Sequence, residues 1–216
     1  MARIEPFDKY LDEYEKWFIE NKYVYESELK AVGHFIPNDK KGIEIGIGTG
    51  RFAVPFGIME GIEPSSVMRN FASLKGLKIY NGTAENLPLE DESYDFALMV
   101  TTICFVDSIL KSFQEINRIL NPGGKIIIGL VDRESSLGKI YQQMKNQNKF
   151  YRFATFYSTS EIVSHLKECN FINIETIQTV FGDLQKIDKV QTFKAGCGEG
   201  GFVVIHAVKV TDKYEG

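Results

Sequence analysis

Cysteine is scarce in this chain, and the three that occur stand far apart. Cys104, Cys169 and Cys197 form no CxxC pair, so the sequence offers neither the paired thiols of a redox motif nor those of a zinc site. Their odd number and wide scatter are typical of reduced thiols in a cytosol, and we expect a cytoplasmic protein. The His, Asp and Glu residues also show no metal-ligand spacing, so we expect no metal site.

Long apolar runs and an excess of basic residues are missing as well. No segment approaches the ~20 apolar residues of a transmembrane helix, and residues 1–6 lack the apolar core of a signal peptide. The formal net charge is −4 and the sequence pI is about 5.5, which disfavours a general affinity for nucleic acids. We therefore expect neither membrane nor nucleic-acid partners.

What is present predicts one α/β domain spanning residues 1–216. Apolar, β-branched segments predict seven strands, at 42–47, 58–63, 77–81, 95–100, 125–131, 171–181 and 202–210. Helices are expected between them, at 7–34, 51–56, after Pro64, at 107–120 and at 160–168. This alternation predicts a doubly wound, mostly parallel sheet, and the glycine-rich residues 196–201 predict that the last strand turns back antiparallel.

The strongest local signal is the heptapeptide Glu44 to Gly50, which reads EIGIGTG. A glycine turn between a strand and a helix lets a ligand approach the backbone closely. The carboxylate of Glu44 inside a strand requires a partner, either a ligand ammonium or a nearby loop. A dinucleotide fingerprint would place a third glycine where Arg51 stands, and no Gly-Lys-Ser/Thr follows as in a phosphate loop. Alone, the motif also fits a plain strand-to-helix turn.

A second signal is Glu63, which ends the second predicted strand. In this architecture such a residue lies beside the glycine turn, where it can accept hydrogen bonds from both ribose hydroxyls of a ligand. Taken alone, it equally fits an acidic strand end before a Pro-Ser helix start. A third signal, residues 81–88 and then 91–95, follows the third predicted strand and leads into the fourth.

Together these motifs resemble the class I S-adenosylmethionine-dependent methyltransferases, in particular the small-molecule and ubiquinone/menaquinone-biosynthesis subgroup. The resemblance covers residues 42–124 and continues more weakly from 157 to 171. It implies a Rossmann-like fold with S-adenosylmethionine as cofactor. The implied cofactor contacts are the methionine part at Gly46, Gly48, Gly50 and Thr101, its ammonium at Glu44, the ribose at Glu63, and the adenine at Thr83 and Ala84.

The chain departs from that family at three places. The family often has Asp where Thr83 stands, so here the adenine amino group has a weaker contact or one from elsewhere. The interval from Gly50 to Glu63 is short by several residues, which predicts a clipped first helix. Residues 104–106, Cys-Phe-Val, replace a histidine-containing sequence, which removes one familiar acid or base.

Two segments are expected to cover the site. The resemblance implies that residues 7–34 form a helical cap in which Tyr10 or Tyr14 walls the pocket. Residues 133–157 mix basic and aromatic side chains and are interpreted as a substrate lid. Candidates for a general base are weak. Asp107, His34 and Tyr10 are named for the case in which the acceptor must lose a proton early.

The predicted function is methyl transfer by in-line displacement to a small molecule, such as an amine, a phenol or a quinol. The leaving group is neutral and the methyl is already electrophilic, so holding the two reactants in line can supply much of the acceleration. The alternative from another class is a protein that binds the cofactor or a partner on the same fold without transferring the methyl group.

Overall fold

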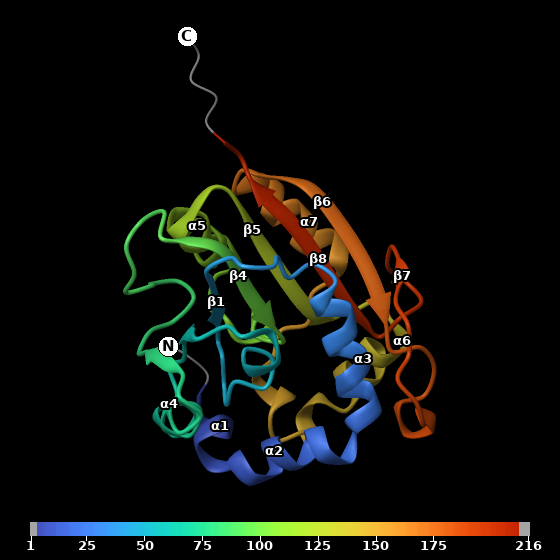
Figure 1. Ribbon diagram of the computed structural model, residues 1–216. Helices are drawn as coiled ribbons and strands as arrows, with labels where there is room; N and C mark the ends of the chain where they lie inside the picture. Colours follow the sequence, from blue (N-terminus) through green and yellow to red (C-terminus); the bar gives the residue numbers. More distant parts are fainter. Residues whose placement is uncertain (1–3, 212–216) are drawn as a thin grey trace.

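One mixed β-sheet organises the protein in the computed structural model, which describes residues 4–211. The strand order is β3-β2-β1-β4-β5-β8-β6-β7 (Figure 1). The strands are β1 Gly42–Ile45, β2 Glu60–Ile62, β3 Lys78–Tyr80, β4 Tyr94–Val100, β5 Leu120–Val131, β6 Phe171–Thr179, β7 Lys194–Ala195 and β8 Phe202–Lys209. The α-helices are α1 Glu5–Lys9, α2 Leu11–Glu20, α3 Lys22–Gly33, α4 Ser66–Ser73, α5 Ile109–Ile119, α6 Ser136–Gln143 and α7 Thr159–Glu168.

The predicted doubly wound fold is confirmed. Strands β3, β2, β1, β4 and β5 pair in parallel, and β8 pairs antiparallel with both β5 and β6. The sheet has eight strands where seven were predicted, because β7 adds an antiparallel edge pairing to Ile177 and Gln178 of β6. A strand of two exposed residues carries no alternating pattern, so nothing in its local sequence marks it.

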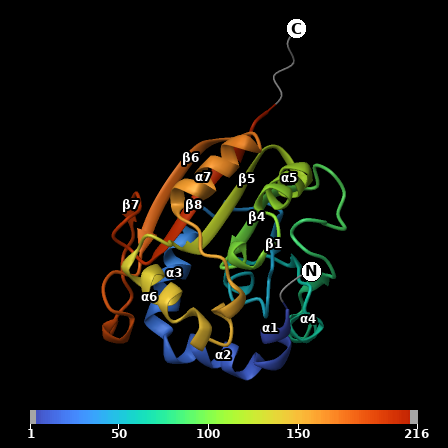
Figure 2. The same ribbon diagram turned by 180° about the vertical axis from the view of Figure 1, so that it is seen from behind.

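Helices cover both faces of the sheet. Helix α3 lies on one face, where Val24, Ala31 and Val32 pack with Ile127 and Val204 in one apolar cluster. Helices α5 and α7 lie on the other face (Figure 2), and the second large cluster joins their apolar sides to the opposite faces of β1, β5 and β8. The central strands are therefore buried on both sides, which explains why they read as continuous apolar runs.

Two of the predicted helical segments, 7–34 and 51–56, do not form single α-helices. The cap, residues 7–34, consists of three helices, because the backbone leaves the helical region at Tyr10 (φ −124°, ψ 40°) and Asn21 (φ −109°, ψ 40°). In 51–56 only a 3₁₀ turn forms, Val54–Phe56, which Gly57 ends in the left-handed conformation with φ 65°. The clipped first helix is thus confirmed.

The cap and the predicted lid meet at the carboxyl ends of β1 and β4. Helices α1 and α2 run across that end of the sheet (Figure 1), and residues 144–153 approach them from the lid. The Nζ atom of Lys149 lies 3.0 Å from Oε1 of Glu13, and the Phe150 ring lies 5.7 Å from that of Phe7. Within residues 4–211, no helix is long and apolar enough to cross a membrane.

Candidate functional site

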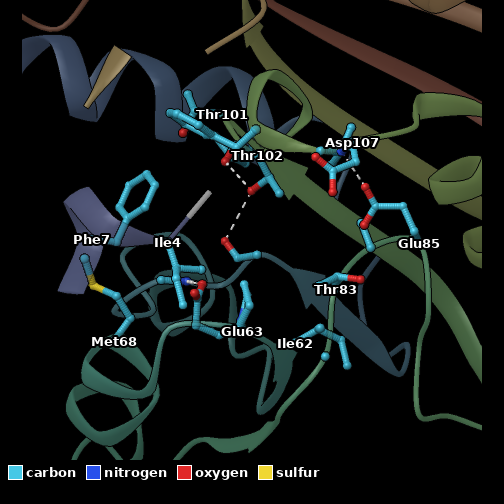
Figure 3. Close-up of a pocket in the computed structure, with 18 of the residues that line it drawn as sticks. Ile4, Phe7, Ile62, Glu63, Met68, Thr83, Glu85, Thr101, Thr102 and Asp107 are labelled. Carbon is cyan, nitrogen blue, oxygen red and sulfur yellow. Dashed lines mark hydrogen bonds between the residues drawn. The ribbon is translucent and has the colours of Figure 1, made fainter. Parts of the chain in front are cut away.

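A cavity of about 110 Å³ opens at the carboxyl ends of β1, β2 and β4. We call it the first cavity. Six of the eight predicted cofactor residues line it, namely Gly46, Gly48, Glu63, Thr83, Ala84 and Thr101. Figure 3 shows Glu63 and Met68 on one side of this space and Thr101, Thr102 and Asp107 on the other. Open α/β sheets bind ligands at this end of their strands, and the six predicted residues meet there in one cavity.

The glycine turn after β1 has no room for side chains. Gly46 and Gly48 have positive φ angles of 72° and 55°, a conformation that favours glycine. A Cβ atom on Gly46 would lie 2.4 Å from the Thr102 side chain, and one on Gly48 would lie 3.0 Å from the Tyr14 hydroxyl. The turn therefore presents bare backbone to the cavity.

Glu63 follows β2 and is oriented by the backbone. Its two carboxylate oxygens accept hydrogen bonds from the N–H groups of Gly48 and Ser65, both at 2.9 Å. Only 7% of the residue is exposed, and burial raises its pKa, while the two N–H groups act in the opposite direction. Each oxygen retains acceptor capacity, as bidentate binding of a diol requires.

Glu44 lies beneath the turn rather than in the wall of the first cavity. It is 2% exposed, and its Oε2 atom has no hydrogen-bond partner within the described residues. Burial raises the pKa of Glu44 well above its usual value, against a hydrogen bond from the Ala53 N–H. An orphaned buried carboxylate oxygen is stabilised by a cation, so the residue fits the predicted role toward a ligand ammonium.

Gly50, the third glycine of the motif, also lies outside the wall of the first cavity. Its φ is 83°, and a Cβ atom there would lie 2.5 Å from Leu77, so Gly50 shapes the turn. Next to it, Arg51 pairs with Glu15 of α2, which also accepts from the Thr49 hydroxyl at 2.5 Å. Arg51, whose position excludes the dinucleotide fingerprint, thus links α2 to the glycine turn through an ion pair.

The far end of the first cavity is formed by the loop after β3 and the start of α5. Thr83 and Ala84 line it together with Glu85 and Asp107. Oε1 of Glu85 accepts from the backbone N–H of Asp107 at 2.6 Å, an interaction visible in Figure 3. This hydrogen bond fixes the two segments to each other and sets the width of the cavity there.

A second cavity of about 420 Å³ adjoins the first. The cap, the lid and the strand ends all contribute to its wall, through residues that include Trp17, Phe18, Glu28, Leu137, Tyr141 and Tyr151. Four residues line both cavities, namely Phe7, Tyr14, Thr101 and Phe105. They mark the place where a group could pass from a ligand in one cavity to a ligand in the other.

Thr101 is in an unusual conformation at this junction. It follows β4 with φ 50°, a region that a β-branched residue occupies only under strain. Its N–H donates to the Gly129 carbonyl at 2.8 Å, and its own carbonyl accepts from Cys104 Sγ at 3.1 Å. These contacts from β5 and from the next turn hold the strained residue in place.

The three weak base candidates lie in different places. Asp107 lines the first cavity, at the end near Thr83. The His34 ring packs against Phe193, with 4.8 Å between the ring centres, and the Tyr10 ring contacts Lys149, whose Nζ lies 4.4 Å from its centre. Neither His34 nor Tyr10 lines either cavity.

Between the two proposed wall residues, the structure places Tyr14 and not Tyr10 at the cavities. Burial raises the pKa of Tyr14 well above its usual value, and the neighbouring carboxylates of Glu44 and Glu63 add to this rise. Tyr14 is therefore a neutral hydroxyl over the glycine turn, able to donate one hydrogen bond.

Sequence reasoning missed Glu28 and Phe105 as cavity residues. Glu28 shares one side of α3 with Val24, Ala31 and Val32, all buried. Glu28 stands four residues after Val24, on the side of the helix that is otherwise apolar. This position could have indicated a functional residue from the sequence, because acidic residues are rarely buried without a function or a partner.

Comparisons with known proteins agree with this geometry. Residues 43–128 match a family model described as "Methyltransferase domain". A crystal structure from Thermotoga maritima, described as a "SAM-dependent methyltransferase, possible histamine N-methyltransferase", is 46% identical with a TM-score of 0.92, and covers 95% of this chain and 98% of its own.

Two curated relatives extend the comparison. The uncharacterized protein MJ1123 of Methanocaldococcus jannaschii is 47% identical over 94% of this chain and 98% of its own. The demethylmenaquinone methyltransferase of Staphylococcus aureus is 24% identical over 73% of this chain and 77% of its own. With the glycine turn and Glu63 in place, this chain belongs to the S-adenosylmethionine-dependent methyltransferases and is an enzyme with S-adenosylmethionine as its cofactor.

Proposed function

We propose that the enzyme transfers the methyl group to a small-molecule acceptor bound in the second cavity. The observation that carries this proposal is the meeting of two cavities at Thr101 and Phe105. One contains the glycine turn and Glu63, and the other is walled by the cap and the lid. At about 420 Å³ the second cavity has the size of a small-molecule site.

For the cofactor, we propose the contacts that the motifs predict. Glu44 would hold the methionine ammonium beside Gly46 and Gly48, and Glu63 would accept from the ribose hydroxyls. Thr83 and Ala84 would flank the adenine, and Thr101 would lie near the sulfonium. In support, Oε2 of Glu44 is buried without a hydrogen-bond partner among the described residues, and the Glu63 carboxylate is oriented by the Gly48 N–H.

The residues at the junction would act by positioning. Bound S-adenosylmethionine supplies an electrophilic methyl, and the S–CH₃ bond breaks as the acceptor atom forms its bond to that methyl. Tyr14 and Phe105, which line both cavities, would align the acceptor and exclude water. A neutral amine acceptor can release its proton after attack, so for an amine the step needs no base in the wall.

The acceptor would be an amine, a phenol or a quinol. Amines are supported by the printed description of the Thermotoga protein, and quinols by that of the Staphylococcus relative. We propose one methyltransferase domain in which 7–34 is the cap and 133–157 the lid. A cytoplasmic location is supported by the absence of disulfides at Cys104, Cys169 and Cys197.

The test has two parts. Titration calorimetry should show S-adenosylhomocysteine and S-adenosylmethionine binding with micromolar dissociation constants, roughly −7 to −8 kcal/mol, and NAD not binding. Formation of S-adenosylhomocysteine should then be measured with histamine, a phenol and a reduced quinone as acceptors. Binding of NAD in place of S-adenosylmethionine would refute the cofactor assignment, and turnover confined to acceptors too large for the cavity would refute the acceptor site.

A further inference from the structure

Glu28 is an acidic residue in the wall of an otherwise mostly apolar and aromatic cavity. It lies on α3, it is 7% exposed, and it lines the second cavity but not the first. Within residues 4–211, its carboxylate makes no hydrogen bond and no ion pair. A buried carboxylate without a partner is destabilising, so its presence calls for a partner that binds in the cavity.

The groups facing Glu28 do not supply that partner. From the lid, Tyr141 and Tyr151 face it, and both are neutral because burial, with Glu28 as a further cause, raises their pKa values, that of Tyr141 to about 12. Lys149 lines the same cavity, but its Nζ pairs with Glu13 at 3.0 Å and lies over the Tyr10 ring. Burial alone raises the Glu28 pKa, to about 8, so the group is protonated at neutral pH while the cavity is empty. A cation that binds beside it favours the carboxylate and offsets this shift.

The walls around this carboxylate are aromatic. Trp17 and Phe18 come from the cap, and Tyr141 and Tyr151 from the lid, the last two with ring centres 4.9 Å apart. Aromatic faces attract organic cations, and they do so more strongly where water is excluded. Of the two carboxylates that line this cavity, Glu13 is paired with Lys149, and Glu28 is the one without a partner among the described residues. An unpaired carboxylate among aromatic rings selects a compact organic cation over a neutral molecule of the same shape.

We propose that Glu28 binds a positively charged nitrogen of the methyl acceptor, which is therefore a small amine cation with an aromatic or apolar body. This inference rests on the proposed function, since it identifies the substrate class of the second cavity. Glu28 is absent from the four residues that line both cavities. The charged nitrogen is thus held away from the junction, and the methyl-accepting atom lies at the other end of the same molecule.

The experiment compares a cation with its neutral analogue. Protein saturated with S-adenosylhomocysteine is titrated with tyramine and with 4-(2-hydroxyethyl)phenol, which differ only in ammonium against hydroxyl. We expect wild type to bind tyramine at least about tenfold more tightly, roughly 1.4 kcal/mol. Glu28→Gln should bring the ratio to within about threefold of one, and Glu28→Asp, which keeps the charge, should retain a preference for tyramine.

The matched control is Glu26→Gln. Glu26 lies on the same helix and pairs at 3.6 Å with Lys22, outside both cavities, so its removal should leave the preference unchanged. Equal binding of the two probes by wild type, binding of neither, or a preference that survives in Glu28→Gln would overturn the inference. Because Glu28 is outside the first cavity, every variant should keep its affinity for S-adenosylhomocysteine. Failure of wild type to bind that molecule would count against the proposed function instead.

Discussion

Replacing Glu28 by glutamine should stabilise the folded protein in a pH-dependent way. The substitution keeps the size of the side chain and removes the charge. Burial raises the pKa of Glu28 from 4.5 to about 8. Below pH 4.5 the carboxyl is neutral in both the folded and the unfolded chain, so its titration does not change the unfolding free energy there. Between the two values the unfolded chain ionises while the folded one stays protonated, so stability falls as pH rises toward 8.

The magnitude follows from the shift. One pKa unit corresponds to about 1.4 kcal/mol, so between pH 5 and pH 8.5 wild type should lose about 4 kcal/mol of unfolding free energy through this one group. Glu28→Gln does not titrate and should escape that loss. The stability gap between the two proteins should therefore be larger by about 4 kcal/mol at pH 8.5 than at pH 5.

Urea denaturation at the two pH values, followed by circular dichroism, measures this gap. For each protein the change in unfolding free energy between the two pH values is measured. Subtracting the change of wild type from that of the variant cancels the contributions of the other titrating groups, which both proteins share. The control Glu26→Gln removes an ion-paired carboxylate from the same helix. The difference in unfolding free energy between this variant and wild type should change by less than about 1 kcal/mol between the two pH values. If the difference in unfolding free energy between Glu28→Gln and wild type is the same at pH 5 and pH 8.5, the reasoning that Glu28 is buried without a partner is refuted.

Four further outcomes are expected. Glu63→Ala should cost about 2–4 kcal/mol of affinity for S-adenosylhomocysteine by calorimetry, because charged hydrogen bonds in a sheltered site are lost; unchanged affinity in a folded variant would make Glu63 a mere strand end. Gly48→Ala should weaken the same binding at least about tenfold, since its φ is 55° and the added methyl would lie 3.0 Å from a tyrosine hydroxyl; a variant that binds normally would show that the turn tolerates a side chain. Segments 7–34 and 133–157 should exchange amide hydrogens more slowly with S-adenosylhomocysteine bound, and equal exchange in both states would contradict their role as cap and lid. Asp107→Asn should lower the turnover number less than tenfold, about 1.4 kcal/mol, because Asp107 lines only the first cavity; a loss of 10²-fold or more with unchanged binding would identify it as a general base.

Local spacing was enough to predict the fold and to propose where the cofactor binds. The glycines of the turn, the acidic end of the second strand and the alternation of strands with helices are each encoded within a few neighbouring residues. Because the carboxyl ends of parallel strands meet at one edge of a sheet, the order of the motifs along the chain sufficed to bring Gly46, Glu63 and Thr101 together. The short interval from Gly50 to Glu63, compared with the family that the sequence resembles, predicted the clipped helix after Gly50.

Tertiary structure decided which side chains line the two cavities. Tyr10 and Tyr14 follow the same helical stripe in sequence, yet the break between α1 and α2 at Tyr10 leaves only Tyr14 over the glycine turn. Glu28 becomes a cavity residue because Tyr141 and Tyr151, more than a hundred residues later, line the same space as its side of α3. Such contacts join segments distant along the chain, and neither local propensity nor periodicity carries information about which of them meet.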